Sequence, residues 1–171
     1  MERGEGLPVF ELDNGLRLGI LTCYDGWFPE PARALSLQGA EMIVWINGRG
    51  GSVEDFIVQA TMFQSHVAMV TTNQACESDP LSGQPPRKPQ EASPATDGSG
   101  TMIAGFDADG EGGAAGILAR CEDQQEDYIV RTLDMAKTRS QRASSRNFAQ
   151  RRPELYGALT DPSLVSGRGE G

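Results

Sequence analysis

Three apolar runs of strand length, separated by helical segments, constrain the fold of this chain most strongly. The runs are residues 16–22 (LRLGILT), 41–46 (EMIVWI) and 67–72 (VAMVTT). Their mostly apolar character is typical of strands buried on both faces of a sheet. One helix is predicted to begin at Pro29 and Pro31 and to end near Gly39, and a second to cover residues 53–65. This alternation predicts an α/β fold with crossover connections.

The rest of the chain predicts a smaller, antiparallel addition to this sheet. A short strand at residues 8–12 precedes a turn at Asn14 and Gly15. Closely spaced strands are predicted at residues 101–106, 114–119 and 128–133. A helix from Met135 to about residue 150 follows them.

The segment 77–100 differs in composition from its neighbours. It is rich in proline, serine and glycine and lacks apolar periodicity, so it predicts a long mobile surface loop. Such a loop is either a disordered insertion or a cover over an active-site mouth. We expect residues 1–160 to form one domain with a sizeable core and residues 161–171 to form a flexible tail.

The acidic composition disfavours several classes of protein. A formal net charge of −9 argues against a nucleic-acid binder, and the basic cluster between residues 137 and 152 is predicted to be a solvated helix face or a subunit contact. Three cysteines without CxxC spacing argue against a disulfide scaffold and a structural zinc site. No apolar run approaches the roughly 20 residues of a membrane span, and no signal-peptide pattern opens the chain, so we expect a cytoplasmic protein.

Cys23 stands between an apolar strand and the start of a helix. The helix dipole favours a thiolate at such a position, and a thiolate attacks a carbonyl or nitrile carbon to form a covalent intermediate. The backbone N–H of Tyr24 is then placed to hold the oxyanion. On spacing alone, a buried structural cysteine is the alternative. Pairing with His66, the single histidine, is a further alternative, although we expect His66 to end its helix.

Residues 19–30 (GILTCYDGWFPE) resemble the nucleophile segment of the nitrilase superfamily of carbon–nitrogen hydrolases. The shared pattern is an apolar strand, Cys, an aromatic residue, Asp, two variable residues and Phe-Pro-Glu. An arginine in the next helix turn, here Arg33, and a Gly-Ala pair at positions 39 and 40 complete it. The Asp-Gly and Asn-Gly pairs at 25–26 and 47–48 lean toward the aliphatic amidase and formamidase branch.

The resemblance extends over roughly residues 6–160. Residues 60–74 are similar to the family's helix-to-strand segment that ends in an asparagine, here Asn73, although Gln64 and Ser65 replace its usual Glu-Asn pair. Residues 99–110 resemble its small-residue strand and Asp-Gly turn, and residues 151–156 its terminal Arg-Arg-Pro…Tyr motif.

The resemblance implies part of an α-β-β-α sandwich whose amino-terminal half is missing. It implies hydrolysis of a small amide through a Cys23 thioester, with the Tyr24 N–H in the oxyanion site and no metal or organic cofactor. A nitrile or carbamoyl compound is another possible substrate, and a homo-oligomer without nucleic-acid or membrane partners is expected. Substrate binding or structural support of the site falls to Asp25, Trp27, Glu30, Arg33 and Asn73.

Individual roles are expected for several of these residues. Asp25 is predicted to hold the turn through backbone N–H groups, and Glu30 and Arg33 to pair on one helix face. Trp27 and Trp45 are predicted to lie in the core or to line the pocket.

Two groups that the family uses are missing at matching positions. The resemblance implies a general-base Glu and an oxyanion-stabilising Lys upstream of the nucleophile, yet the 22 residues ahead of Cys23 contain no lysine. The two lysines of the chain, Lys88 and Lys137, both follow Cys23. We therefore expect this chain alone to be inactive or nearly so. The alternative is a non-catalytic binding or assembly subunit that retains the fold.

Overall fold

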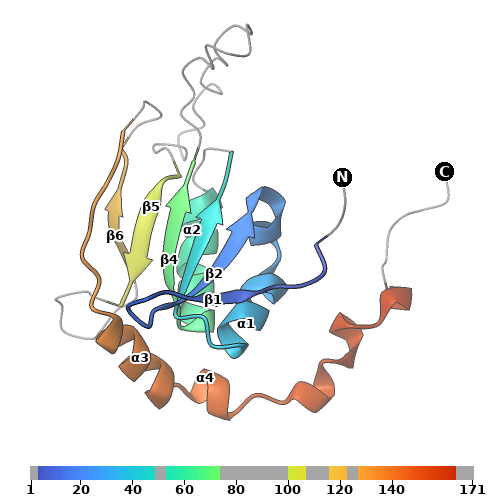
Figure 1. The fold of residues 1–171 in the computed structure, drawn as a ribbon. Coiled ribbons are helices and arrows are strands. Elements are labelled where there is room, and N and C mark those ends of the chain that lie inside the picture. The colour runs from blue at the N-terminus through green and yellow to red at the C-terminus, as the bar shows by residue number, and fades with distance from the viewer. Residues whose placement is uncertain (1–3, 49–52, 74–99, 107–115, 123–126, 165–171) are drawn as a thin grey trace, which may run out of the picture.

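A six-stranded mixed sheet with strand order β1-β2-β3-β4-β5-β6 forms the centre of the molecule (Figure 1). The computed structural model describes residues 4–48, 53–73, 100–106, 116–122 and 127–164. The strands are β1 (Val9–Glu11), β2 (Arg17–Thr22), β3 (Met42–Ile46), β4 (Ala68–Thr72), β5 (Met102–Gly105) and β6 (Gly116–Arg120). The helices are α1 (Pro29–Leu37), α2 (Val53–Ser65), α3 (Met135–Ser144) and α4 (Arg146–Ala149). The 3-10 turns are η1 (Cys23–Trp27), η2 (Pro153–Leu155), η3 (Gly157–Leu159) and η4 (Pro162–Leu164).

The three central strands run parallel, and the outer ones are antiparallel to their neighbours. The connections β2-α1-β3 and β3-α2-β4 place both helices on the same face of the sheet (Figure 1). The predicted α/β alternation with crossovers is therefore confirmed.

The predicted strand at 128–133 is wrong. The described residues 127–134 are extended but join no ladder. The segment has strand-like alternation, yet Tyr128 and Val130 are each 83% exposed, so no packing supports pairing with β6. The predicted helix at 135–150 is also interrupted, because Ser145 leaves the helical conformation and caps α4 by accepting the Asn147 N–H at 3.0 Å.

Two of the expected boundaries are not tested by the fold. The predicted loop lies, except for Gly100, outside the described residues, and so does the tail from residue 165 onward. No helix in the described part of the chain is long and apolar enough to cross a membrane.

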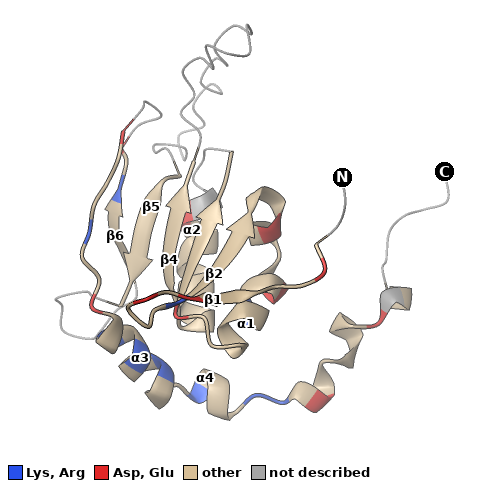
Figure 2. Ribbon diagram, viewed as in Figure 1, with Lys and Arg blue, Asp and Glu red and all other residues tan. Residues whose placement is uncertain are grey.

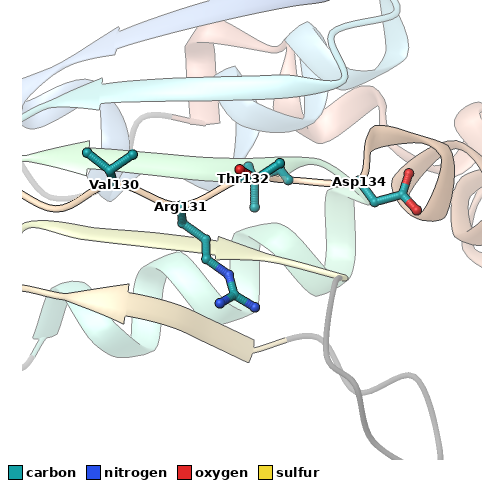
Figure 3. A pocket seen from close by; sticks show the side chains of 5 residues that line it. Val130, Arg131, Thr132 and Asp134 are labelled. Atoms are coloured by element: carbon teal, nitrogen blue, oxygen red, sulfur yellow. The ribbon is translucent and has the colours of Figure 1, made fainter.

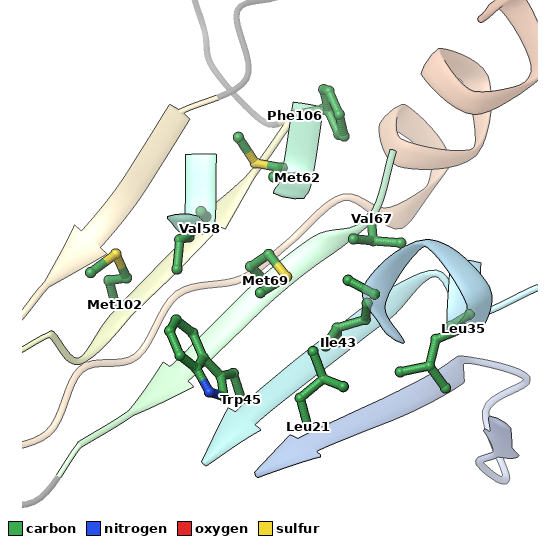
Figure 4. Packing of buried hydrophobic residues seen from close by; sticks show 13 residues of the cluster. Leu21, Leu35, Ile43, Trp45, Val58, Met62, Val67, Met69, Met102 and Phe106 are labelled. Atoms are coloured by element: carbon green, nitrogen blue, oxygen red, sulfur yellow. The ribbon is translucent and has the colours of Figure 1, made fainter. Parts of the chain in front are cut away.

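The core lies between the sheet and its two covering helices. Successive side chains of a strand point to opposite faces, and those of Leu21, Ile43, Trp45 and Met69 are buried beneath α1 and α2 (Figure 4). The other face carries Ile20 and Ile46, which are 41% and 49% exposed. Ile103 of β5 lies on the same face but is only 8% exposed, so the exposure is confined to the other end of the sheet. Parallel strands in proteins are normally covered on both faces, so the half-exposed isoleucines of β2 and β3 depart from the usual pattern.

The carboxyl-terminal helices dock at the end of the sheet where the parallel strands begin. Arg142 of α3 donates from Nη1 to the Ala40 carbonyl at 2.8 Å and from Nη2 to the Ser36 carbonyl. Arg139 forms an ion pair with Glu41. Figure 2 shows these basic residues in blue along α3. The prediction of a solvated basic face is therefore wrong for Arg142, which is half-buried and satisfies carbonyl groups at the end of α1.

His66 forms the second part of this docking site. It ends α2 with φ of +47° and is only 6% exposed. Its Nε2 lies 2.6 Å from the Ser145 hydroxyl oxygen, and its ring stacks on Phe106 at 5.7 Å between ring centroids. Burial, and then the positive charges of Arg33 and Arg142, lower the pKa of His66. The folded protein therefore favours the neutral imidazole.

Replacing Arg142 with Ala tests how α3 is held. The substitution removes a charged donor from two backbone carbonyls, so we expect the free energy of unfolding to fall by about 1.5–3 kcal/mol. Urea denaturation measures this change. Arg146→Ala, at an exposed position on α4, is the matched control and is expected to change stability little. Equal losses of unfolding free energy in both variants would contradict the role of Arg142 in holding α3.

The pH dependence of stability tests the neutral state of His66. Because its pKa is lowered on folding, its stabilising contribution is complete above the ordinary value of about 6.5 and is lost as pH falls through the folded value. We expect the free energy of unfolding to decrease between pH 7.5 and 5.5. His66→Asn, which tolerates positive φ and cannot titrate, is expected to flatten this dependence. An unchanged slope in that variant would show that another group is responsible.

Candidate active site

The carboxyl ends of the three parallel strands meet at one edge of the sheet. Thr22, Ile46 and Thr72 are paired in register as the last residues of β2, β3 and β4. Neighbouring strands lie about 4.8 Å apart, so the ends of β2 and β4 are separated by roughly 10 Å. The residues that follow them are Cys23, Asn47 and Asn73. In α/β folds this edge is where ligands bind, and we call it the carboxyl edge.

Cys23 occupies the sharp turn between β2 and α1. Its side chain is exposed, and its φ of +48° lies in the left-handed region, which costs a non-glycine residue about 1–2 kcal/mol. Asp25 stabilises the turn, because its Oδ2 accepts the N–H of Thr22 at 3.0 Å, as the sequence predicted. The turn therefore presents a thiol to solvent on a backbone whose conformation is held by its surroundings.

Trp45 of β3 contacts the same turn from beneath. Its side chain is fully buried, and its Nε1 donates to the Cys23 carbonyl at 2.8 Å. Gly26 lies against the indole so closely that a Cβ at this position would be 2.2 Å from the ring. Trp45 therefore belongs to the core, one of its two predicted places, and also bonds to the backbone of Cys23. The sequence pattern did not predict that bond.

Aromatic side chains surround the turn. Tyr24 is 67% exposed, and its ring meets that of Phe28 edge-on at 5.0 Å between centroids. Trp27 is half-buried and packs against the core. The Tyr24 N–H follows Cys23 directly in the chain, and its part in an oxyanion site stays a prediction.

Glu30 and Arg33 do not form the expected pair. Glu30 is exposed in the first turn of α1, and the ion pairs among the described residues do not include it. The Arg33 guanidinium instead lies over the Phe148 ring of α4, 5.4 Å from its centroid. Burial, and then the charge of Arg151, lower the pKa of Arg33. The structure thus places Arg33 with the docked carboxyl-terminal helices and not beside the thiol.

Two asparagines share the carboxyl edge with the turn. Asn73 is half-buried, and its backbone N–H donates to Thr101 Oγ1 at 3.0 Å. Asn47 is 6% exposed, and its N–H donates to the Thr72 carbonyl at 2.9 Å. Asn47 was missed as a site candidate, although its place directly after the second apolar strand was a usable signal.

His66 lies at the opposite edge of the sheet from Cys23. It precedes β4, whose first residue Ala68 is level with Leu18 near the start of β2. Four residues of strand separate Leu18 from Thr22, which corresponds to roughly 13 Å. A hydrogen bond between His66 and the thiol is therefore excluded, and so is a Cys23–His66 hydrolase.

A hollow elsewhere on the molecule does not contribute to this site. It is lined by Val130, Arg131, Thr132, Leu133 and Asp134 of the extended segment before α3 (Figure 3). None of these residues is a predicted site residue. In the described part of the chain, no three His, Cys, Asp or Glu side chains gather closely enough to hold a metal ion.

Comparison with known proteins places this chain in a family. Residues 1–143 match the family model described as carbon-nitrogen hydrolase. The chain is 30% identical over 156 residues to the N-carbamoylputrescine amidase of Arabidopsis thaliana, covering 90% of this chain and 50% of that protein. It therefore spans about half the length of this curated relative.

Solved structures share the fold. The carbon-nitrogen hydrolase from Helicobacter pylori G27 superposes with a TM-score of 0.71 at 20% identity, covering 95% of this chain and 55% of that one. The E41Q mutant of the amidase from Nesterenkonia sp. AN1 gives a TM-score of 0.63 at 20% identity, covering 92% of this chain and 49% of that one. Its structure shows covalent addition of the acetamide moiety of fluoroacetamide at the active-site cysteine of that protein. The resemblance of the nucleophile segment, the α/β topology and the family match agree, and the chain belongs to the carbon-nitrogen hydrolase family.

Proposed function

We propose that this chain carries the nucleophile of a small-amide hydrolase. The observation that carries the proposal is the exposed Cys23 thiol, held in a left-handed turn at the carboxyl edge of the parallel strands. The covalent adduct on the active-site cysteine of the Nesterenkonia amidase supports the same role for Cys23.

The proposed reaction proceeds through a thioester. The Cys23 thiolate attacks the amide carbon, and the oxyanion that forms is held by the Tyr24 N–H. Transfer of a proton to nitrogen lets the C–N bond break, which releases ammonia or an amine. Water then attacks the thioester, frees the acid and returns the thiol. Asn73, together with the turn residues Asp25 and Trp27, binds the substrate or supports the site structurally at this edge.

The family resemblance assigns the proton transfers to a Glu and part of the oxyanion site to a Lys, and this chain has neither at a matching position. Lys137 lies on α3, which docks at the opposite edge through Arg139 and Glu41. Lys88 lies outside the described residues. We therefore infer that the chain alone is inactive or nearly so, and that the base and the lysine come from elsewhere. If nothing supplies them, a non-catalytic binding or assembly subunit is the second candidate function.

The half-exposed apolar side chains on β2 and β3 support packing against a further layer. Ile20 and Ile46 stand on the parallel strands with nearly half of each side chain in solvent. An apolar sheet face of this kind buries most area against a second sheet. We propose that the sheet of an amino-terminal half packs against these isoleucines. We also propose that the resulting protein forms a homo-oligomer.

The thiols are expected to differ in reactivity. Cys23 is exposed at the turn, whereas Cys121 is 3% exposed and Cys76 lies outside the described residues. Brief iodoacetamide treatment of the folded protein, followed by peptide mapping, is expected to label Cys23 first. Cys23→Ala is expected to abolish the fast phase. Faster labelling of Cys76 or Cys121 would count against the site.

Complementation tests the hydrolase itself. We expect co-expression with the amino-terminal half of a nitrilase-superfamily amidase to give ammonia release from formamide, acetamide or an N-carbamoyl amine. Each half alone is expected to be silent, because base, oxyanion donor and nucleophile act as a unit.

Two variants control this experiment. Cys23→Ala is expected to abolish activity, since Cys23 is the only thiol that the described residues place at the turn. Cys121→Ala is expected to retain it, because Cys121 follows β6, four strand spacings or roughly 19 Å from β2. A soluble, folded pair that releases no ammonia would overturn the hydrolase proposal and leave the non-catalytic subunit as the leading one.

A further inference from the structure

The indole of Trp45 connects the core to the backbone of the nucleophile. We propose that Trp45 is a positioning residue: its N–H holds the Cys23 carbonyl and thereby keeps Cys23 in the left-handed conformation that presents the thiol at the carboxyl edge. That this positioning assists catalysis rests on the proposed function of Cys23. That Trp45 holds the backbone of Cys23 does not depend on any activity.

The position of the indole is set by the sheet. Trp45 pairs in register with Leu21 of β2 and Thr71 of β4, and its side chain is 0% exposed. A fully buried indole cannot bond to water, so its N–H needs a partner within the protein. The Cys23 carbonyl, 2.8 Å away, is that partner. Moving Cys23 away would leave a buried donor unsatisfied.

The turn is shaped to receive the indole. Gly26 lies three residues after Cys23, and a Cβ there would be 2.2, 2.5 and 2.6 Å from three atoms of the Trp45 side chain. The backbone of η1 therefore approaches the indole as closely as its atoms allow. Any side chain at position 26 would displace the turn from the ring and weaken the bond to Cys23.

The bond acts on a residue that would otherwise leave its conformation. Cys23 has φ of +48°, although L-residues other than glycine disfavour this region. The Asp25 carboxylate accepts the N–H of Thr22, the residue before Cys23. The Trp45 indole N–H donates to the carbonyl of Cys23 itself. The Cys23–Tyr24 peptide unit directly after the thiol and the Leu21–Thr22 unit one residue before it are thus held, which restricts the direction of the Cys23 Cα–Cβ bond. Orientation of this kind is what a covalent nucleophile requires.

A double-mutant cycle measures this coupling without substrate. With Trp45 intact, alanine at position 23 is strained at positive φ and glycine is not. We therefore expect the unfolding equilibrium constant of Cys23→Ala to be roughly fivefold larger than that of Cys23→Gly. Trp45→Phe keeps an aromatic ring and removes the N–H. In that background the backbone at position 23 is free to relax, and we expect the ratio of the alanine to the glycine unfolding constant to fall below about twofold.

A matched control separates coupling from general destabilisation. Val58→Ala removes buried volume from α2 and is expected to leave the fivefold ratio unchanged. If Trp45→Phe does not fold, Gly26→Ala displaces the turn from the other side and is expected to abolish the ratio in the same way. A ratio that persists in the Trp45 or Gly26 background overturns the inference.

The complemented enzyme supplies the catalytic readout. A misplaced nucleophile slows the chemical step more than substrate binding, so Trp45→Phe is expected to lower kcat about 10- to 100-fold with KM nearly unchanged. Val58→Ala is expected to change neither substantially. An unchanged kcat in an active Trp45→Phe pair overturns the positioning role. If the wild-type pair is inactive, the hydrolase proposal fails, and the cycle alone decides whether Trp45 holds Cys23.

Discussion

The pairing of β3 with a parallel strand on each side is the constraint on which the structure depends. Parallel neighbours require a crossover, and the two crossover helices bury one face of the sheet. The same pairing brings the ends of β2, β3 and β4 to one edge. One arrangement of strands therefore produces both the edge that carries the Cys23 thiol and the core that supports this edge. Trp45 belongs to both, since it lies in the middle strand and bonds to the turn after the first.

The half-exposed isoleucines on β2 and β3 are the main departure from an ordinary α/β domain. Burying apolar surface contributes about 25 cal/mol per Å², so half-exposed isoleucines on two parallel strands leave stabilisation unrealised. The chain spans about half of a curated relative, and its fold matches about half of solved relatives.

Sequence predicted the elements whose signals are local. The apolar runs gave the strands, the paired prolines gave the start of α1, and residues 53–65 gave α2 with its observed bounds. The prediction of a strand at residues 128–133 was wrong because alternation of side chains does not ensure a partner strand or a covering surface. Arg33 was misplaced because its neighbour Phe148 is more than a hundred residues away in the chain. The nucleophile segment was recognisable as a contiguous motif, whereas the Trp45 bond to Cys23 depends on strand register and on the missing side chain of Gly26.

Helix α1 separates two regions that can change independently. The nucleophile turn precedes its first residue, whereas Arg142 bonds to carbonyls at and beyond its last turn. Nine residues of helix measure about 13.5 Å, a distance at which substitutions that share no partners act additively. Substitutions in the turn that carries Cys23 therefore need not disturb the attachment of α3. Drift in the residues of α3 that bond to the end of α1 likewise leaves the backbone of the Cys23 turn in place, and the fold is modular along its first helix.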